Sequence, residues 1–119
     1  MNKITAKVID SSTNGEISRI VANANELIFS ILLLDNIQIG QTITLAFKEN
    51  NILVARKIEG TNNSFFAKIE SIEKDSMFAK LKLKSNDISI KAIVDINSNF
   101  KENEEVVWHI LDSEIMIIE

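Results

Sequence analysis

Hydrophobic and polar residues alternate along much of the chain, with the period of two that is typical of β-strands buried on one face. Ile4, Ala6 and Val8 alternate with polar neighbours and predict the first strand. Further strands are predicted at residues 17–22, 27–34, 42–47 and 52–55, the last returning as a hairpin on the strand before it. Turn-forming residues separate these segments at 11–15, which contains an Asn-Gly pair, at 23–26 and at 50–51.

The same pattern begins again after the polar, glycine-containing segment 59–63. Ala67 and Ile69 stand where Ala6 and Val8 stand in the first copy, at an offset of 61 positions. Later pairs, at offsets of 61 and then 63, are Leu27 with Ile88, Leu45 with Trp108 and Ile52 with Ile115. The second copy therefore carries two additional residues, placed in the loop 95–105, and the strand registers are kept.

Five short strands per copy predict an all-β protein built from two tandem five-stranded OB-like small barrels. The predicted domains are residues 1–58 and 63–119. A single sandwich of about ten strands is the alternative that the pattern leaves open. A unit of this size buries only about 60% of its unfolded surface, so the two copies are expected to pack on each other or on another subunit.

The third predicted strand is apolar on both faces. If its odd-numbered residues fill the barrel, Ile28, Leu32 and Leu34 lie outside. An exposed apolar stripe of this kind usually marks an interface. Two interpretations stay open, packing of copy one on copy two within the chain and formation of a homo-oligomer, a dimer or trimer.

Charge and composition argue against several classes of protein. The formal net charge is −4, and residues 102–119 carry six acidic side chains and no lysine or arginine. The cluster Lys80, Lys82 and Lys84 is interpreted as a solvated strand face, so nucleic acid is not expected as a partner. The chain has no cysteine, no apolar run of the roughly 18 residues that span a membrane and no secretory leader, which predicts a cytoplasmic protein.

Catalytic chemistry is not indicated. The only histidine, His109, follows Trp108, and alternation places the tryptophan inside and the histidine outside. A lone outward histidine is ordinarily a surface residue, and a metal site normally needs three or four ligands. The sequence contains no nucleophile elbow and no phosphate loop, so the protein is not expected to be an enzyme.

Several segments resemble the TOBE domain, also called the molybdenum-pterin binding (Mop) domain. Residues 2–8 (NKITAKV) and 63–69 (NSFFAKI) are similar to its opening N-x-L-x-(A/G)-x-V. Residues 40–48 (GQTITLAFK), followed by Ile52 and Leu53, are similar to its later G-x-x-V-x-(A/L)-x-(I/F)-K and closing strand. The second copy keeps this segment at 105–110 without the glycine, and the resemblance covers nearly the whole chain.

The resemblance implies a cytoplasmic protein that binds molybdate or tungstate in molybdenum storage or homeostasis. Because the chain has no helix-turn-helix region and no phosphate loop, it resembles the stand-alone form of the family. Whether a molybdopterin binds is left open. The alternative is an interaction module that has lost its ligand and acts with a molybdate transporter ATPase or a regulator.

The resemblance also implies candidate ligands for a tetrahedral dianion, which needs several N–H and O–H donors and usually one cation. The family's cationic ligand falls on Lys48, and the second copy has Leu111 there. In the loop after the third strand, only the second copy offers donors, Asn97 and Ser98, beside an unfavourable Asp95. The opening asparagines, Asn2 and Asn63, complete the candidates, and a site is expected to need residues of both copies.

Overall fold

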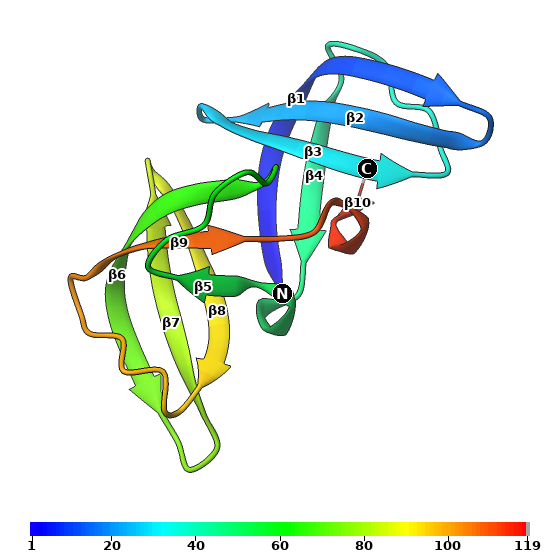
Figure 1. Ribbon diagram of the computed structural model, residues 1–119. Helices are drawn as coiled ribbons and strands as arrows, with labels where there is room; N and C mark the ends of the chain where they lie inside the picture. The colour runs from blue at the N-terminus through cyan, green and yellow to red at the C-terminus, as the bar shows by residue number, and fades with distance from the viewer. Residues whose placement is uncertain (119) are drawn as a thin grey trace.

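The computed structural model describes residues 1–118, which form two five-stranded antiparallel sheets and no α-helix (Figure 1). Glu119, the end of the second predicted domain and of the acidic segment, lies outside the described residues. The strands are β1 (Asn2–Asn14), β2 (Ile17–Ala24), β3 (Leu27–Leu33), β4 (Thr42–Phe47), β5 (Leu53–Ala55), β6 (Ser64–Lys74), β7 (Phe78–Ser85), β8 (Ile88–Asp95), β9 (Glu105–His109) and β10 (Met116–Ile118). Short 3-10 turns, η1 (Glu49–Asn51) and η2 (Asp112–Glu114), precede β5 and β10, the last strand of each copy.

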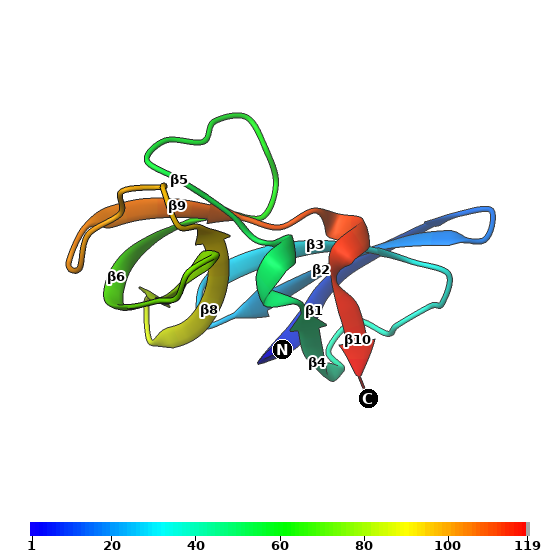
Figure 2. The same ribbon diagram turned by 90° about the horizontal axis from the view of Figure 1, so that it is seen from below.

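The predicted all-β class, two five-stranded OB-like units, is confirmed. The first sheet has the order β10-β4-β1-β2-β3 and the second the order β5-β9-β6-β7-β8. Seen from below, the second sheet curls into a half-barrel (Figure 2). No helix in the described part of the chain is long and apolar enough to cross a membrane.

The first hairpins are longer than predicted. Residues 11–14 were expected in a turn, but β1 continues through them and pairs as far as Asn14 with Ile17. The turn is therefore two residues long, and Gly15 supplies the left-handed conformation with φ +67°. The next turn is equally short, since Asn25 and Glu26 both have positive φ.

The internal repeat is visible in the irregularities of the strands as well as in their order. β1 has a bulge between Val8 and Asp10, and β6 has one at the matching place, between Ile69 and Ser71. Beside the first bulge, Gly40 donates its N–H to the carbonyl of Val8 at 2.8 Å. Asn103 makes the same 2.8 Å bond to Ile69, so asparagine replaces glycine at a left-handed position.

The last strand of each copy joins the sheet of the other copy. Residues 52–55 were predicted to return as a hairpin on the strand before them, and this was wrong. β5 pairs instead with β9, with Val54 opposite Trp108, and β10 pairs with β4, with Ile117 opposite Leu45. The turns η1 and η2 direct the chain across, and each contacts an edge strand of the opposite sheet, β8 and β3 respectively. The predicted domain bounds, 1–58 and 63–119, describe the two copies of the sequence repeat and stay a prediction.

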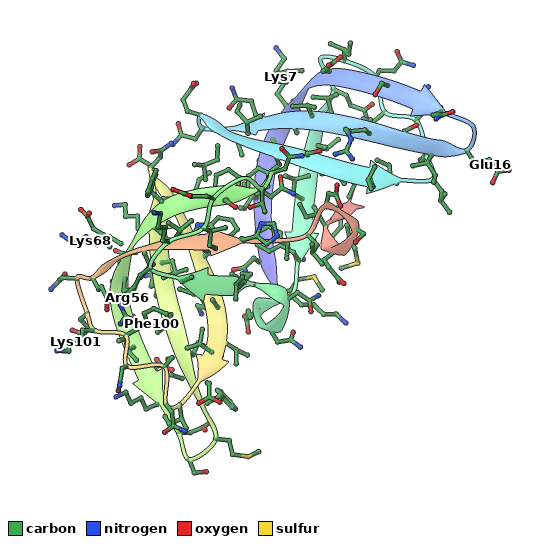
Figure 3. The ribbon with its side chains drawn as sticks, in the orientation of Figure 1. Lys7, Glu16, Arg56, Lys68, Phe100 and Lys101 are labelled. Atoms are coloured by element: carbon green, nitrogen blue, oxygen red, sulfur yellow. The ribbon has the colours of Figure 1, made fainter. Side chains whose placement is uncertain are left out.

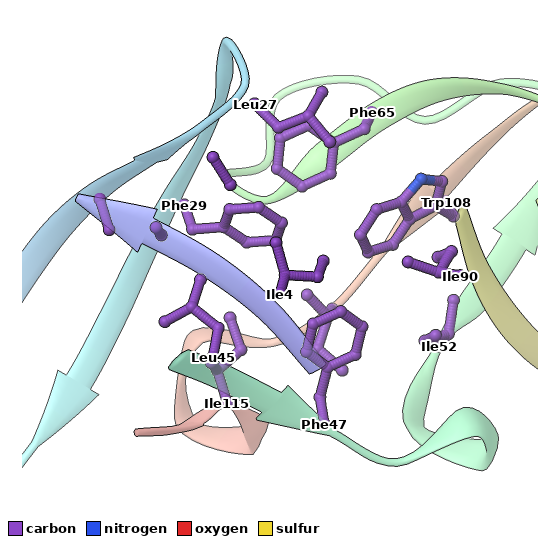
Figure 4. Packing of buried hydrophobic residues seen from close by; sticks show 14 of the residues in the cluster. Ile4, Leu27, Phe29, Leu45, Phe47, Ile52, Phe65, Ile90, Trp108 and Ile115 are labelled. Atoms are coloured by element: carbon purple, nitrogen blue, oxygen red, sulfur yellow. The ribbon is translucent and has the colours of Figure 1, made fainter. Parts of the chain in front are cut away.

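One hydrophobic core serves both sheets (Figure 4). Phe29 and Phe47 come from the first sheet, and Phe65 and Trp108 from the second. The ring centroids of Phe29 and Phe65 are 4.6 Å apart, and those of Phe65 and Trp108 are 4.9 Å apart, in tilted arrangements. Aromatic pairs at these distances stabilise beyond their buried area by about 0.5–1.5 kcal/mol. The packing of copy one on copy two is therefore central to the fold.

The outward positions of the third strand are as predicted. Ile28 is 45% exposed and Leu34 is 80% exposed, whereas Leu32 is half-buried. Phe29 and Ile31 point into the core. The packing of the two copies does not cover this stripe, so the expected interface with another chain stays a prediction.

The exchanged strands lead to a first prediction. Residues 1–58 expressed alone will not fold as a monomer, because β4 would lose β10, β5 would lose β9, and half of the aromatic core would be exposed. Far-UV circular dichroism and analytical ultracentrifugation measure this. A cooperatively unfolding monomer of 1–58 would contradict the exchange, and mixing with 59–119 is expected to restore the native spectrum.

Candidate anion-binding site

Asn63, a predicted site residue, ties the two sheets together. It lies just before β6 with φ +57°, a left-handed conformation that asparagine tolerates well. Its Oδ1 accepts the N–H of Ser30 at 2.7 Å, and its Nδ2 donates to the carbonyl of Ser30 at 2.9 Å. The side chain thus satisfies both polar backbone groups of a residue on β3, the edge of the first sheet.

Asn2 does the same on the opposite side of the molecule. Its Nδ2 donates to the carbonyl of Lys91 at 2.8 Å, and its Oδ1 accepts the N–H of Lys91 at 2.8 Å. Lys91 lies on β8, the edge of the second sheet, at the position that matches Ser30. Both opening asparagines are therefore buried tethers, and each keeps one amide N–H that these two bonds do not use.

A surface pocket of about 480 Å³ lies beside Asn63, between the outer face of β2 and β3 and the segment that leads into β6. A water molecule takes up about 30 Å³ in the liquid, so a small anion would fill only part of this pocket. It is lined by Arg19, Val21, Ile28, Ser30, Thr61, Asn62, Asn63, Ser64 and Phe65. We call this the Arg19 pocket.

Arg19 supplies the cation of the pocket. It projects from β2, since its neighbour Ile20 is fully buried, and its position is fixed by two contacts. The guanidinium Nη1 donates to the hydroxyl of Ser30 and to a carboxylate oxygen of Asp112 at 3.2 Å. Its Nε and Nη2 make no hydrogen bond to any residue in the range 1–118, so a planar set of donors is available for a ligand.

Hydroxyl groups complete the donor set. The Oγ1 of Thr61 and the Oγ of Ser64 are 2.5 Å apart, and the Ser64 hydroxyl lies 3.3 Å from Nδ1 of His109. A second, smaller pocket of about 230 Å³ adjoins at residues 61–63 and is lined also by His109 and Asp112. His109 is half-buried, and its ring fixes a hydroxyl of the site.

The other predicted ligands lie elsewhere. Lys48 is exposed and immediately precedes η1 in the sequence, and its side chain makes no hydrogen bond that caps this turn. Asn97 and Ser98 lie in the loop after β8, where their backbone N–H groups bond to Asp95 at 2.7 and 3.1 Å. Within one chain, these three residues and the two tethers do not form a common pocket among those found in residues 1–118.

The residues of the Arg19 pocket that sequence reasoning missed are Arg19, Ser30, Thr61 and Ser64. Arg19 carried a usable signal, because it is one of only two arginines and alternates with the buried Ile20. Ser30 carried none, since it lies within an otherwise apolar strand. The contact between Ser30 and the segment before β6 joins residues far apart in sequence, and only the fold brings them together.

The carboxyl groups with shifted pKa values lie outside the Arg19 pocket. Among residues 1–118 there are two of them, Glu104 and Asp75, and neither lines the pocket. The side-chain hydrogen bond from Arg56 holds the pKa of Glu104 below its usual value, and the N–H groups of Met77 and Phe78 do the same for the pKa of Asp75. Residues 1–118 contain no group of three histidine or carboxylate side chains placed to hold a metal ion.

Comparison with known structures identifies the architecture. The chain superposes on the cytoplasmic molybdate-binding protein ModG, in a crystal form with molybdate bound, with a TM-score of 0.91. The two chains share one fold. The match covers 98% of this chain and 94% of ModG at 11% sequence identity, a level at which the likeness establishes the fold alone. No protein-family model and no curated protein sequence matches the chain.

The tether geometry gives a second prediction. Asn63→Ala is expected to lower the free energy of unfolding by about 2–4 kcal/mol, because it leaves two buried backbone groups of Ser30 without partners. Asn62→Ala, at the exposed neighbouring position, is the control and is expected to change stability by less than about 0.5 kcal/mol. Urea denaturation measures both. Equal stability of the two variants would show that the tether contributes little.

Proposed function

We propose that this protein binds a small tetrahedral oxyanion, molybdate or tungstate, in the Arg19 pocket. The observation that supports this most directly is the donor set, one guanidinium with three hydroxyls and a buried amide on two elements held together by Asn63. The ModG fold supports the same conclusion, since that protein binds molybdate. The resemblance of residues 2–8, 40–48 and 63–69 to the Mop domain agrees with this proposal.

The chemistry of the pocket suits a dianion better than a substrate. A guanidinium and hydroxyl groups donate hydrogen bonds from fixed positions, and charge-assisted bonds of this kind are about twice as strong as neutral ones. Asp112 opposes binding, because its carboxylate shares Nη1 of Arg19. The other hydrogen-bond donors of Arg19 still favour an anion. We therefore expect the pocket to bind it with moderate affinity, which fits storage or homeostasis of molybdenum in the cytoplasm without catalysis.

The predicted ligands Lys48, Asn97 and Ser98 belong to this proposal only through an oligomer. They are exposed or half-buried and lie away from the Arg19 pocket of their own chain, so a second subunit would have to bring them to it. Asn63 would then act as a tether with one amide N–H left for the anion, whereas Asn2, which lies outside the Arg19 pocket of its own chain, would have to reach the anion from a second subunit. A homodimer or homotrimer that uses the stripe of Ile28 and Leu34 is proposed on this ground.

The apolar stripe also supports a second candidate function. Ile28 lines the Arg19 pocket and is nearly half exposed, so the pocket and the stripe form one surface. A partner protein, such as a molybdate transporter ATPase or a regulator, would then cover the same surface, and the protein would act as an interaction module without a ligand. No molybdopterin is required by either function.

Isothermal titration with molybdate and tungstate tests the first function. Arg19→Gln is expected to weaken binding by about 10- to 100-fold, the cost of losing charge-assisted hydrogen bonds of about 1.5–3 kcal/mol. Arg56→Gln, which breaks the ion pair with Glu104 far from the pocket, is the control and is expected to bind as the unmodified protein does. The absence of heat and of any thermal shift in the unmodified protein would reject oxyanion binding and favour the interaction module.

Sedimentation tests the oligomer. Analytical ultracentrifugation at micromolar concentration is expected to show a dimer or trimer, and Leu34→Asp is expected to shift it toward the 13.4 kDa monomer. Lys48→Gln is expected to weaken anion binding only if the oligomer forms. A clean monomer of the unmodified protein would overturn the oligomer and, with it, the role proposed for Lys48, Asn97 and Ser98.

A further inference from the structure

The outer face of the second sheet carries a stripe of lysines that the oxyanion site does not use. Lys80, Lys82 and Lys84 project outward from β7, since the residues between them are buried. Strand pairing places Lys68 opposite Lys84 and Lys91 opposite Lys82, so five ammonium groups share one face of β6, β7 and β8. We call this the lysine face, and Lys68 can be seen projecting from β6 in Figure 3.

None of the five lysines lies within salt-bridge distance of a carboxylate among the described residues. Acidic residues nevertheless share this face. Glu105 lies opposite Lys68, Glu73 lies opposite Lys80 and Asp95 lies opposite Phe78, and Glu70 accepts a hydrogen bond from Ser89, the residue paired with Lys84. A shallow pocket of about 340 Å³ lies between Ser71, Glu73, Lys80, Lys82 and Lys91. At the centre of the face, Lys82, Lys84 and Lys91 lie opposite lysine or serine and not opposite a carboxylate, so the positive charge is concentrated there.

An aromatic side chain lies at each end of the lysine face. Phe66 projects from β6 two positions before Lys68, is 85% exposed and lines a pocket of about 260 Å³ together with Ala67, Lys68, Lys84 and Glu105. Phe78 begins β7, two positions before Lys80, and is also exposed. The six residue-to-residue steps from Phe78 to Lys84 span roughly 20 Å along the strand.

Hydrogen bonds hold the backbone of Phe66, beneath its exposed ring. Trp108 donates its Nε1–H to the hydroxyl of Ser85 at 2.9 Å, and that hydroxyl donates to the carbonyl of Phe66 at 2.6 Å. The backbone under the ring is thus anchored to the aromatic core. The ring therefore lies above a fixed point of the sheet, where an unpaired base can stack on it.

The first sheet lacks this combination, although it has the same fold. Its residues at the matching positions are Thr5 for Phe66, Lys7 for Lys68, Arg19 for Lys80, Val21 for Lys82, Asn23 for Lys84 and Ser30 for Lys91. The repeat therefore supplies an internal comparison. The stripe is a property of the second copy, and the common architecture does not require it.

The sequence alone indicated a solvated strand face here, but strand pairing adds Lys68 and Lys91 to it, and the exposed Phe66 lies at one end. On this ground we propose that the lysine face, with Phe66 at one end, binds single-stranded nucleic acid. Ammonium groups on flexible stems suit the repeated phosphates of a chain better than one small anion, which needs enclosing donors. Exposed aromatic rings beside such a groove stack on unpaired bases, as in other OB-like proteins. The surface lies on a different sheet face from the Arg19 pocket, so the two sites are independent.

Fluorescence anisotropy with a labelled 15-residue oligothymidine at 20 mM salt tests this binding. Saturable binding is expected to weaken with salt, with a log–log slope of about −0.7 for each lysine that contacts a phosphate. The variant K80Q/K82Q/K84Q removes three of these lysines, so its log–log slope is expected to be less negative by about 2. The control K3Q/K7Q/K57Q removes three exposed lysines elsewhere and is expected to leave the slope unchanged.

The stacking contribution is tested separately. Phe66→Ala is expected to lower affinity for the oligothymidine about tenfold, with an unchanged thermal midpoint because the ring is exposed. Inorganic polyphosphate has no bases to stack on Phe66, so its own binding to the same variant is expected to be unchanged when it competes with the oligothymidine. The proposal is overturned by an absence of binding, by equal loss in the control triple variant, or by affinity for polyphosphate or duplex that equals affinity for the single strand.

Discussion

The contact between the aromatic cores of the two copies is the interaction on which the rest of the structure depends. Neither copy of this length can bury enough apolar surface by itself. Phe29 and Phe47 on one side and Phe65 and Trp108 on the other fill a single interior. Around this interior, the exchanged strands and the two asparagine tethers close the edges that packing alone would leave open. The Arg19 pocket exists because one of these tethers brings the segment before β6 onto β3.

Much of the fold could be predicted because the alternation of residues reports directly on which side of a strand each residue lies. Ile4, Ala6 and Val8 are buried as expected, Trp108 points inward, and Ile28 and Leu34 point outward. The two additional residues in the loop after β8 could also be predicted, because the alternation of each strand is kept on both sides of that loop. These features depend only on local spacing.

The partner of a short strand is not a local property. β5 has the same pattern whether it pairs with β4 or with β9, and the choice is made by η1, which turns the chain away from its own sheet. The same reason explains the site. Asn63 could be singled out from the sequence, but its role as a tether and its neighbours Arg19 and Ser30 depend on a contact across the two sheets. Lys48 resembled a ligand by position alone, and its surroundings in a single chain do not support that role.

The exchange of terminal strands also has a consequence for the history and assembly of such a chain. Two separate copies could build the same arrangement only by association, and their folding would depend on protein concentration. The segment between β5 and β6 joins them, so each strand meets its partner at an effective concentration in the millimolar range whatever the dilution. Once joined, the copies no longer need identical sequences, and each outer face can diverge. Here one outer face carries a pocket with an arginine, and the other carries lysines beside an exposed phenylalanine.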